Sequence, residues 1–95
     1  MANLLTNGEL EAMEDRLRTI SPGPWKSCLE GRDHIGGSSF VMVGEGTDRR
    51  DDLEITGISA ADQDFIAACR QDVPRLIAEV KRLRTLLRRE SETQP

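Results

Sequence analysis

The sequence predicts an α+β protein with an N-terminal helix, a small antiparallel sheet and two C-terminal helical segments. Residues 7–20 and 73–89 carry apolar side chains at spacings of three and four, which is the period of an amphipathic helix. Between them, short segments that alternate or are wholly apolar are separated by glycine-rich turns, which is typical of strands. Because the connections are short, we expect a three-stranded antiparallel meander, with room for a fourth strand.

The first helix is expected over residues 7–20. Thr6 and Glu9 have the spacing of a capping box, in which each side chain accepts a hydrogen bond from the other residue's backbone N–H. Proline cannot continue the helical hydrogen bonds, so Pro22 and Pro24 should end the helix. Its apolar stripe consists of Leu10, Met13, Leu17 and Ile20.

Strands are expected at residues 25–30, 40–43 and 53–56. The first and third alternate between apolar and polar residues, whereas the second is wholly apolar and therefore suits a central position. Trp25 directly follows the proline turn. We expect it to anchor the core and to seal the first helix against the sheet, rather than to stack on a ligand.

Two helical segments are expected between residues 60 and 89. Ser59 and Asp62 mark the start of the first, since a hydroxyl cap suits the exposed N–H groups and an acid suits the positive end of the helix. Asp72 and Pro74 resemble a new cap and a first-turn proline, so we expect a kink or a restart there. The first segment is expected to bury Phe65, Ala68 and Cys69.

The last segment carries an apolar row that favours pairing with another helix. A three-four spacing runs through Val73, Leu76 or Ile77, Val80, Leu83 and Leu87. With one Trp, two Phe and no Tyr, the core of this 95-residue chain must be thin, which makes subunit association attractive. We therefore predict one domain over residues 1–90, a disordered tail over residues 91–95 and a homo-oligomer. The predicted interface consists of Val73, Ile77, Val80, Leu83 and Leu87.

The charge distribution argues against a uniformly basic nucleic-acid-binding face, because the net charge is −4. Arg75, Arg82 and Arg89 nevertheless recur every seven residues and share one side of the last helix. They could follow a phosphate backbone, or they could flank an oligomer seam with their stems covering its apolar edge. Without interleaved aromatic residues, we favour the second interpretation.

The cysteines and the absence of a targeting pattern predict where in the cell the protein resides. Cys28 and Cys69 are far apart and fit no metal-ligand spacing, so we expect buried free thiols and no metal site or cofactor. No segment has the pattern of a signal peptide or reaches membrane-spanning length, so we expect a cytoplasmic protein without membrane contact.

The loop at residues 31–39 is the segment that most resembles a ligand site. It combines a fixed positive charge, the histidine, two adjacent glycines and two hydroxyls. Glycines let backbone N–H groups turn toward an anion, and the arginine and serines add charge and hydrogen bonds, so a phosphate-bearing ligand would suit it. The alternative is a hairpin connection whose arginine and aspartate pair locally. The candidate ligand-binding residues are Arg32, Asp33, His34, Gly36, Gly37, Ser38 and Ser39.

Catalysis has less support, and we predict no enzymatic activity. His34, Asp33 and the two serines supply the residue types of a nucleophilic site, but all lie in one short loop without an evident oxyanion hole. The acidic pairs in the chain are explained by solvated turns and helix starts.

Three segments resemble Ead-like early proteins of phages: SPGPW at residues 21–25, DFIAA at residues 64–68 and VPRLIAEVKRLR at residues 73–84. The resemblance covers most of the chain, and its motifs are structural, so no catalytic residues are implied. It implies a small phage-encoded protein that acts in the host cytosol on host machinery.

Two functions follow as hypotheses. The first is a non-enzymatic oligomer that sequesters a small anionic, nucleotide-like ligand of host defence. The alternative is an interaction adaptor whose C-terminal amphipathic helix binds a host protein.

Overall fold

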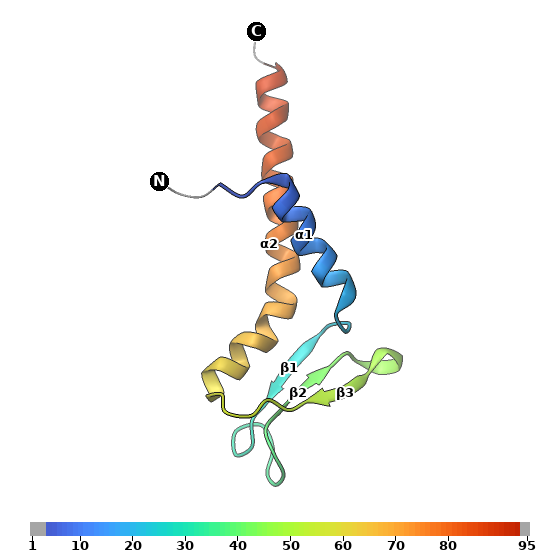
Figure 1. Ribbon diagram of the computed structural model, residues 1–95, viewed down its shortest axis with the longest axis vertical. Helices are drawn as coiled ribbons and strands as arrows, with labels where there is room; N and C mark the ends of the chain where they lie inside the picture. The colour runs from blue at the N-terminus through green and yellow to red at the C-terminus, as the bar shows by residue number, and fades with distance from the viewer. Residues whose placement is uncertain (1–3, 94–95) are drawn as a thin grey trace. The chain divides into compact units, whose positions relative to one another are not determined.

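The computed structural model describes residues 4–93 (Figure 1). Two helices, α1 (Asn7–Thr19) and α2 (Ala60–Thr93), and three strands, β1 (Trp25–Cys28), β2 (Phe40–Val43) and β3 (Arg50–Leu53), make up the predicted α+β fold. The described chain forms two compact units. We call residues 20–72 the sheet unit, and residues 4–19 together with residues 73–93 the helical unit. Helix α2 contributes to both.

The expected restart of the helix at Asp72–Pro74 is wrong, because α2 runs without interruption for 34 residues with Pro74 inside it. Proline removes one backbone hydrogen bond and disfavours a helix interior. Packing on both sides of Pro74 outweighs that cost, since α2 buries Ala67 in the sheet unit and Ile77 in the helical unit. The helix also extends through residues 91–93, where a disordered tail was expected; residues 94 and 95 lie outside the described residues.

The sheet is the predicted antiparallel meander in the order β1-β2-β3. Trp25 lies opposite Val43 and Cys28 opposite Phe40. The third strand was expected at residues 53–56, but β3 ends at Leu53. The reason lies in the preceding turn, where a 3-10 turn at Gly46–Asp48 reverses the chain early.

The core of the sheet unit is formed by Val41 and Val43 of β2 together with Ala67 of α2, and Trp25 packs against this cluster. The Trp25 indole N–H donates to the Pro22 carbonyl oxygen at 3.2 Å. Trp25 is thus a core anchor as predicted, but its neighbours in the cluster are strand β2 and helix α2.

Two glutamines of α2 bind strand backbone. Gln63 is 3% exposed, and its side-chain N–H group donates to Ser27 Oγ at 2.9 Å and to the Phe40 carbonyl at 3.0 Å. The Gln71 amide accepts from Trp25 N–H at 2.7 Å and donates to the Trp25 carbonyl at 3.1 Å. The sheet-facing side of α2 therefore consists of positions 63, 67 and 71. The prediction that Phe65 is buried is wrong, since it is 71% exposed.

In the helical unit, α1 packs antiparallel to the second half of α2. Glu14 pairs with Lys81 at 2.9 Å, and Asn7 Oδ1 accepts from Arg84 at 2.8 Å, so residues that come earlier in α1 meet residues that come later in α2. Leu10 and Ile77 are buried in this unit.

The predicted start of α1 is confirmed by a reciprocal pair of hydrogen bonds. Thr6 N–H donates to Glu9 Oε1 at 2.9 Å, and Glu9 N–H donates to Thr6 Oγ1 at 3.0 Å. Ser59 and Asp62 form the same pair at the start of α2.

Candidate functional site

The loop predicted as a ligand site connects β1 to β2 in the sheet unit. Gly31, Gly36 and Gly37 have φ of 88°, 85° and 91°, a region that L side chains rarely adopt. The Gly31 N–H donates to the His34 carbonyl at 2.7 Å, which closes a tight turn. The positive φ of these glycines therefore allows the backbone turns of the loop.

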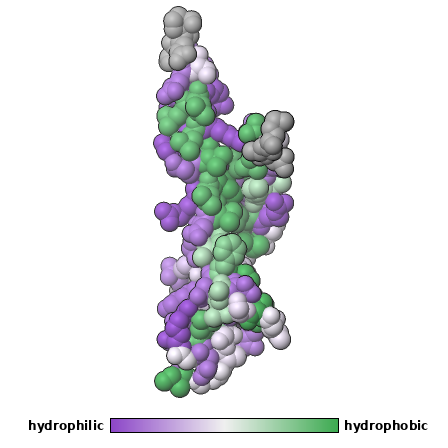
Figure 2. Space-filling model, turned by 90° about the vertical axis from the view of Figure 1, so that its left-hand side faces the viewer, coloured by the Kyte–Doolittle hydropathy of each residue, from purple (hydrophilic) through white to green (hydrophobic). Residues whose placement is uncertain are grey.

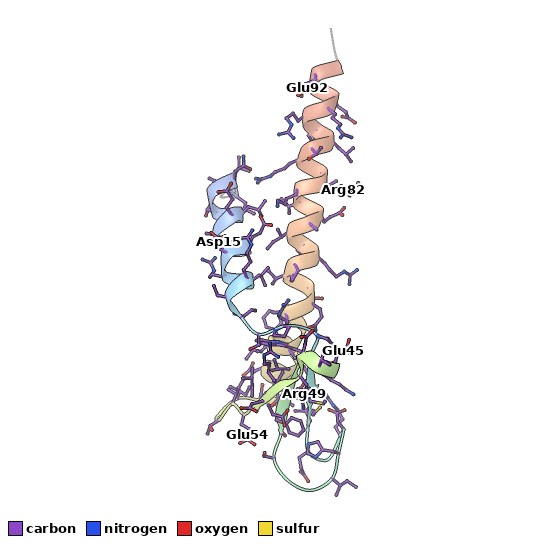
Figure 3. The ribbon with its side chains drawn as sticks, turned by 90° about the vertical axis from the view of Figure 1, so that its right-hand side faces the viewer. Asp15, Glu45, Arg49, Glu54, Arg82 and Glu92 are labelled. Carbon is purple, nitrogen blue, oxygen red and sulfur yellow. The ribbon has the colours of Figure 1, made fainter. Side chains whose placement is uncertain are left out.

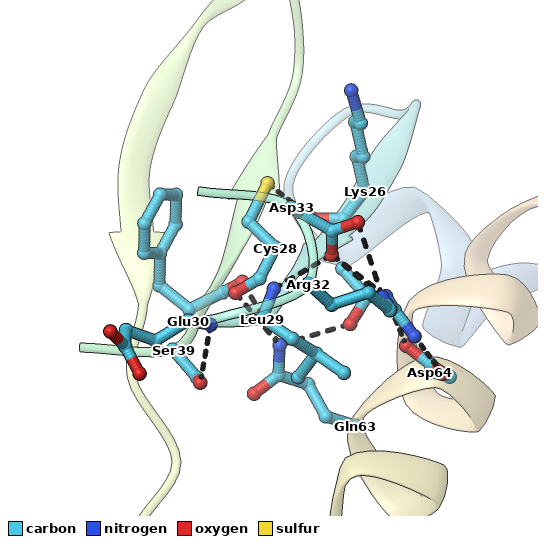
Figure 4. Close-up of polar contacts among 11 residues, drawn as sticks. Lys26, Cys28, Leu29, Glu30, Arg32, Asp33, Ser39, Gln63 and Asp64 are labelled. Atoms are coloured by element: carbon cyan, nitrogen blue, oxygen red, sulfur yellow. Dashed lines mark hydrogen bonds and ion pairs between the residues drawn. The ribbon is translucent and has the colours of Figure 1, made fainter. Parts of the chain in front are cut away.

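Arg32 is held between two carboxylates (Figure 4). Its two terminal nitrogens donate to Asp64 at 2.8 and 3.0 Å, and its Nε and one terminal nitrogen donate to Asp33 at 2.8 to 3.1 Å. Asp64 lies in the second turn of α2, so this ion pair ties the loop to the helix. Asp33 in turn accepts from the Leu29 N–H at 2.8 Å.

The charges in this cluster stabilise one another. Hydrogen bonds from Arg32 and Ser27, in that order, lower the pKa of Asp64 below its ordinary value. Hydrogen bonds from the Arg32 side chain and the Leu29 backbone lower the pKa of Asp33. The carboxylates of Asp64 and Asp33 raise the pKa of Arg32. All three groups are therefore ionised at neutral pH, and the cluster carries a net negative charge.

Both serine hydroxyls of the loop and the N–H of Gly36 also have partners within the chain. Ser38 Oγ donates to Glu54 at 2.9 Å, and Ser39 Oγ accepts from the Glu30 N–H at 3.1 Å. Gly36 N–H lies 3.4 Å from Glu30 Oε1.

His34 is turned toward the sheet rather than toward the serines. Its ring lies 5.2 Å from that of Phe40, and Nδ1 contacts the Gly36 carbonyl at 3.2 Å. A carbonyl only accepts, so Nδ1 carries the proton and Nε2 is left buried without a partner among the described residues. Neither serine hydroxyl is bonded to the imidazole.

The contacts of Arg32 and of the two serines limit which ligands the loop can bind. The structure brings Arg32 and Asp33 together, but it also adds Asp64, which comes from a position 32 residues further along the chain. An anionic ligand would have to displace a carboxylate from Arg32 and would meet Glu30 and Glu54 near the serines. Ligand binding at residues 31–39 stays a prediction, and the local charge does not favour an anion.

The interface residues predicted for the last helix divide between two sides of α2. Ile77 is 6% exposed and is covered within the helical unit, and Val73 and Val80 are half-buried. By contrast, Leu83 and Leu87 are 45% and 65% exposed. The predicted interface contains Ile77 and not Leu76, but at this point of the helix the exposed side chain is that of Leu76, at 63%.

We call the row formed by Leu76, Val80, Leu83 and Leu87 the leucine face. Figure 2 shows hydrophobic side chains gathered in a band along the helical unit, and Leu86, also exposed, lies beside the row. Ile77 and Arg84 border the leucine face on the side of α1. Glu79 and Arg82 border it on the other side, which we call the free flank. Figure 3 shows Arg82 on the side of α2 that is turned away from α1.

Residues 4–93 contain neither a cluster of metal ligands nor a membrane-spanning helix. No group of three or more His, Cys, Asp or Glu side chains in this range is arranged to hold a metal ion. In the same range, neither helix is apolar enough over a sufficient length to cross a bilayer. Cys28 is a buried and Cys69 a half-buried free thiol.

Comparison with known proteins gave no matching family model, no similar curated protein and no similar solved structure. The resemblance to Ead-like phage proteins therefore stays a prediction from the residues.

Proposed function

We propose that this is a non-enzymatic interaction protein that associates with a second copy of itself through the leucine face of α2. One observation carries the proposal: Leu76, Leu83 and Leu87 are 45–65% exposed at helical spacing, although α1 already covers the neighbouring side of the same helix. Soluble proteins rarely leave a contiguous apolar row uncovered, and such rows mark interaction sites. A cytosolic location belongs to the same proposal.

The expected strength of association follows from these exposures. Burying a leucine completely contributes about 1.5–3 kcal/mol, and each of these side chains would gain roughly half of that. Association itself costs several kcal/mol in translational and rotational freedom. We therefore expect a reversible dimer whose population rises with protein concentration.

Sedimentation velocity over a concentration series tests the proposal with two variants. Leu83→Glu places a charge in the middle of the leucine face and should yield a monomer at every concentration. Leu53→Glu is the matched control, because Leu53 is 38% exposed on β3 and lies outside the helical unit. It should associate like the wild type. A wild-type protein that stays monomeric throughout, or a Leu83→Glu variant that associates normally while its circular dichroism is unchanged, would refute the proposal.

Native mass spectrometry of freshly purified protein addresses the first hypothesis from the sequence at the same time. Extra mass of nucleotide size, lost in an Arg32→Ala variant, would support ligand sequestration by residues 31–39. A bare dimer would support the interaction protein alone.

A further inference from the structure

We infer that two copies pair antiparallel along α2, about a two-fold axis that passes between Lys81 and Arg82. This inference rests on the proposed function and names its partner and geometry. Four observations support it: the spacing of the leucine face, the position of Glu79 and Arg82, the side of α2 that α1 occupies, and the basic residues near the end of α2.

The spacing of the leucine face is the same in both directions. Its four members are separated by steps of four, three and four residues. A two-fold axis at the centre of the row therefore places Leu76 of one copy opposite Leu87 of the other, and Val80 opposite Leu83. Every apolar side chain meets an apolar side chain, as a self-complementary interface requires.

The free flank gains matching charges in this arrangement. A two-fold axis perpendicular to the helices brings the free flank of one copy next to the free flank of the other. Glu79 then lies about two residues along the axis, or roughly 3 Å, from the level of Arg82 of the other copy. Within one chain these two side chains already form an ion pair at 2.5 Å, in which Arg82 lowers the pKa of Glu79. Because of the two-fold symmetry, the ion pair between Glu79 of one copy and Arg82 of the other would form twice.

A parallel pair would lack this match. It would bring the free flank of one copy next to the α1 side of the other, where Ile77 is buried and Arg84 donates to Asn7 and to the Leu5 carbonyl. Glu79 would lie about five residues, or roughly 8 Å along the axis, from the level of Arg84 of the other copy.

The basic end of α2 also favours the antiparallel pair. A parallel pair would set Arg88 and Arg89 of the two copies at the same level along the helix axis. In the antiparallel pair these residues lie about seven residues on either side of the axis, so the two basic ends are roughly 20 Å apart. That distance exceeds two Debye lengths at physiological salt, so their repulsion is screened.

Cysteine cross-linking tests the orientation. Leu76→Cys and Leu87→Cys chains, one of them labelled with ¹⁵N, are oxidised separately and as a mixture, and linked peptides are identified by mass spectrometry. The peptide masses also separate these links from any formed by Cys28 or Cys69. A disulfide needs Cα atoms closer than about 7 Å, whereas antiparallel pairing keeps the two copies of residue 76 roughly 16 Å apart.

We expect a link between residues 76 and 87 in the mixture and none of either variant with itself. A dimer in which Leu76→Cys links to itself would overturn the antiparallel inference and leave the proposed function intact. A dimer without any of these links would also overturn the antiparallel inference, because Leu76 of one copy would then not lie opposite Leu87 of the other. The proposed function would again stand. Absence of a dimer in the sedimentation experiment would instead refute the proposed function.

Discussion

Replacing Gln63 by methionine removes the hydrogen-bonding groups of the most buried polar side chain in the sheet unit while nearly keeping its length. Gln63 donates to Ser27 Oγ at 2.9 Å and to the Phe40 carbonyl at 3.0 Å, and the Cys28 carbonyl lies 3.5 Å away. Water cannot easily replace the lost donor, because Gln63 is 3% exposed. The acceptors on β1 and β2 would therefore lose a partner.

Each buried polar group left without a partner costs about 1–3 kcal/mol. Two such acceptors give an expected loss of roughly 2–6 kcal/mol in the free energy of unfolding, which is a large part of the stability of a small domain. Methionine fills a similar volume, so little of this loss would come from a cavity.

Urea unfolding monitored by Trp25 fluorescence measures the effect, because Trp25 packs in the core cluster of the sheet unit. Arg75→Met is the matched control on the same helix; Arg75 is exposed, so its replacement should change stability by less than about 0.5 kcal/mol. If Gln63→Met unfolds at the same urea concentration as the control, the claim that Gln63 fastens α2 to the sheet is wrong.

Two further predictions concern the turns of the sheet unit. The lowered pKa values of Asp33 and Asp64 mean that their stabilising contribution is complete above the ordinary value of 3.8 and is lost as the pH falls through the lowered values. Arg32→Met should raise both pKa values in an NMR titration and destabilise the protein at neutral pH but not in strong acid; unchanged pKa values would contradict the ion-pair cluster. Gly44→Ala should destabilise more than Gly57→Ala, because both glycines have positive φ but only at Gly44 would a Cβ collide with the Asp48 carbonyl oxygen. Equal urea midpoints for the two variants would show that the loss of stability comes from the positive φ alone and not from the collision with Asp48.

The parts of the fold that depend on local chemistry were predicted from the sequence. Thr6 with Glu9 and Ser59 with Asp62 place both helix starts, because each pair acts within three residues. Strand β2 was also predicted correctly, since a wholly apolar run suits the centre of a sheet. Pro74 misled the prediction because its local signal is opposed by packing on either side of it.

Features that depend on distant partners were not predictable. The burial of Gln63 is invisible to a hydrophobic pattern, because a polar residue enters the core only when it has acceptors there. Asp64 gives no sequence signal of its pairing with Arg32. The exposure of Leu76 in place of the predicted Ile77 was not predictable either, because it depends on which side of α2 is covered by α1.

The two edges of the sheet have a consequence for aggregation. In an antiparallel pair the N–H and C=O of one residue point to the same side, and Gln71 takes both groups of Trp25, as a neighbouring strand would. At the opposite edge, β3 presents Arg50, Asp51 and Asp52, all exposed. Charged residues on an edge discourage the addition of further strands. The capped backbone of Trp25 at one edge and the charges of β3 at the other thus oppose strand addition. We therefore expect no amyloid at the concentrations at which the protein dimerises.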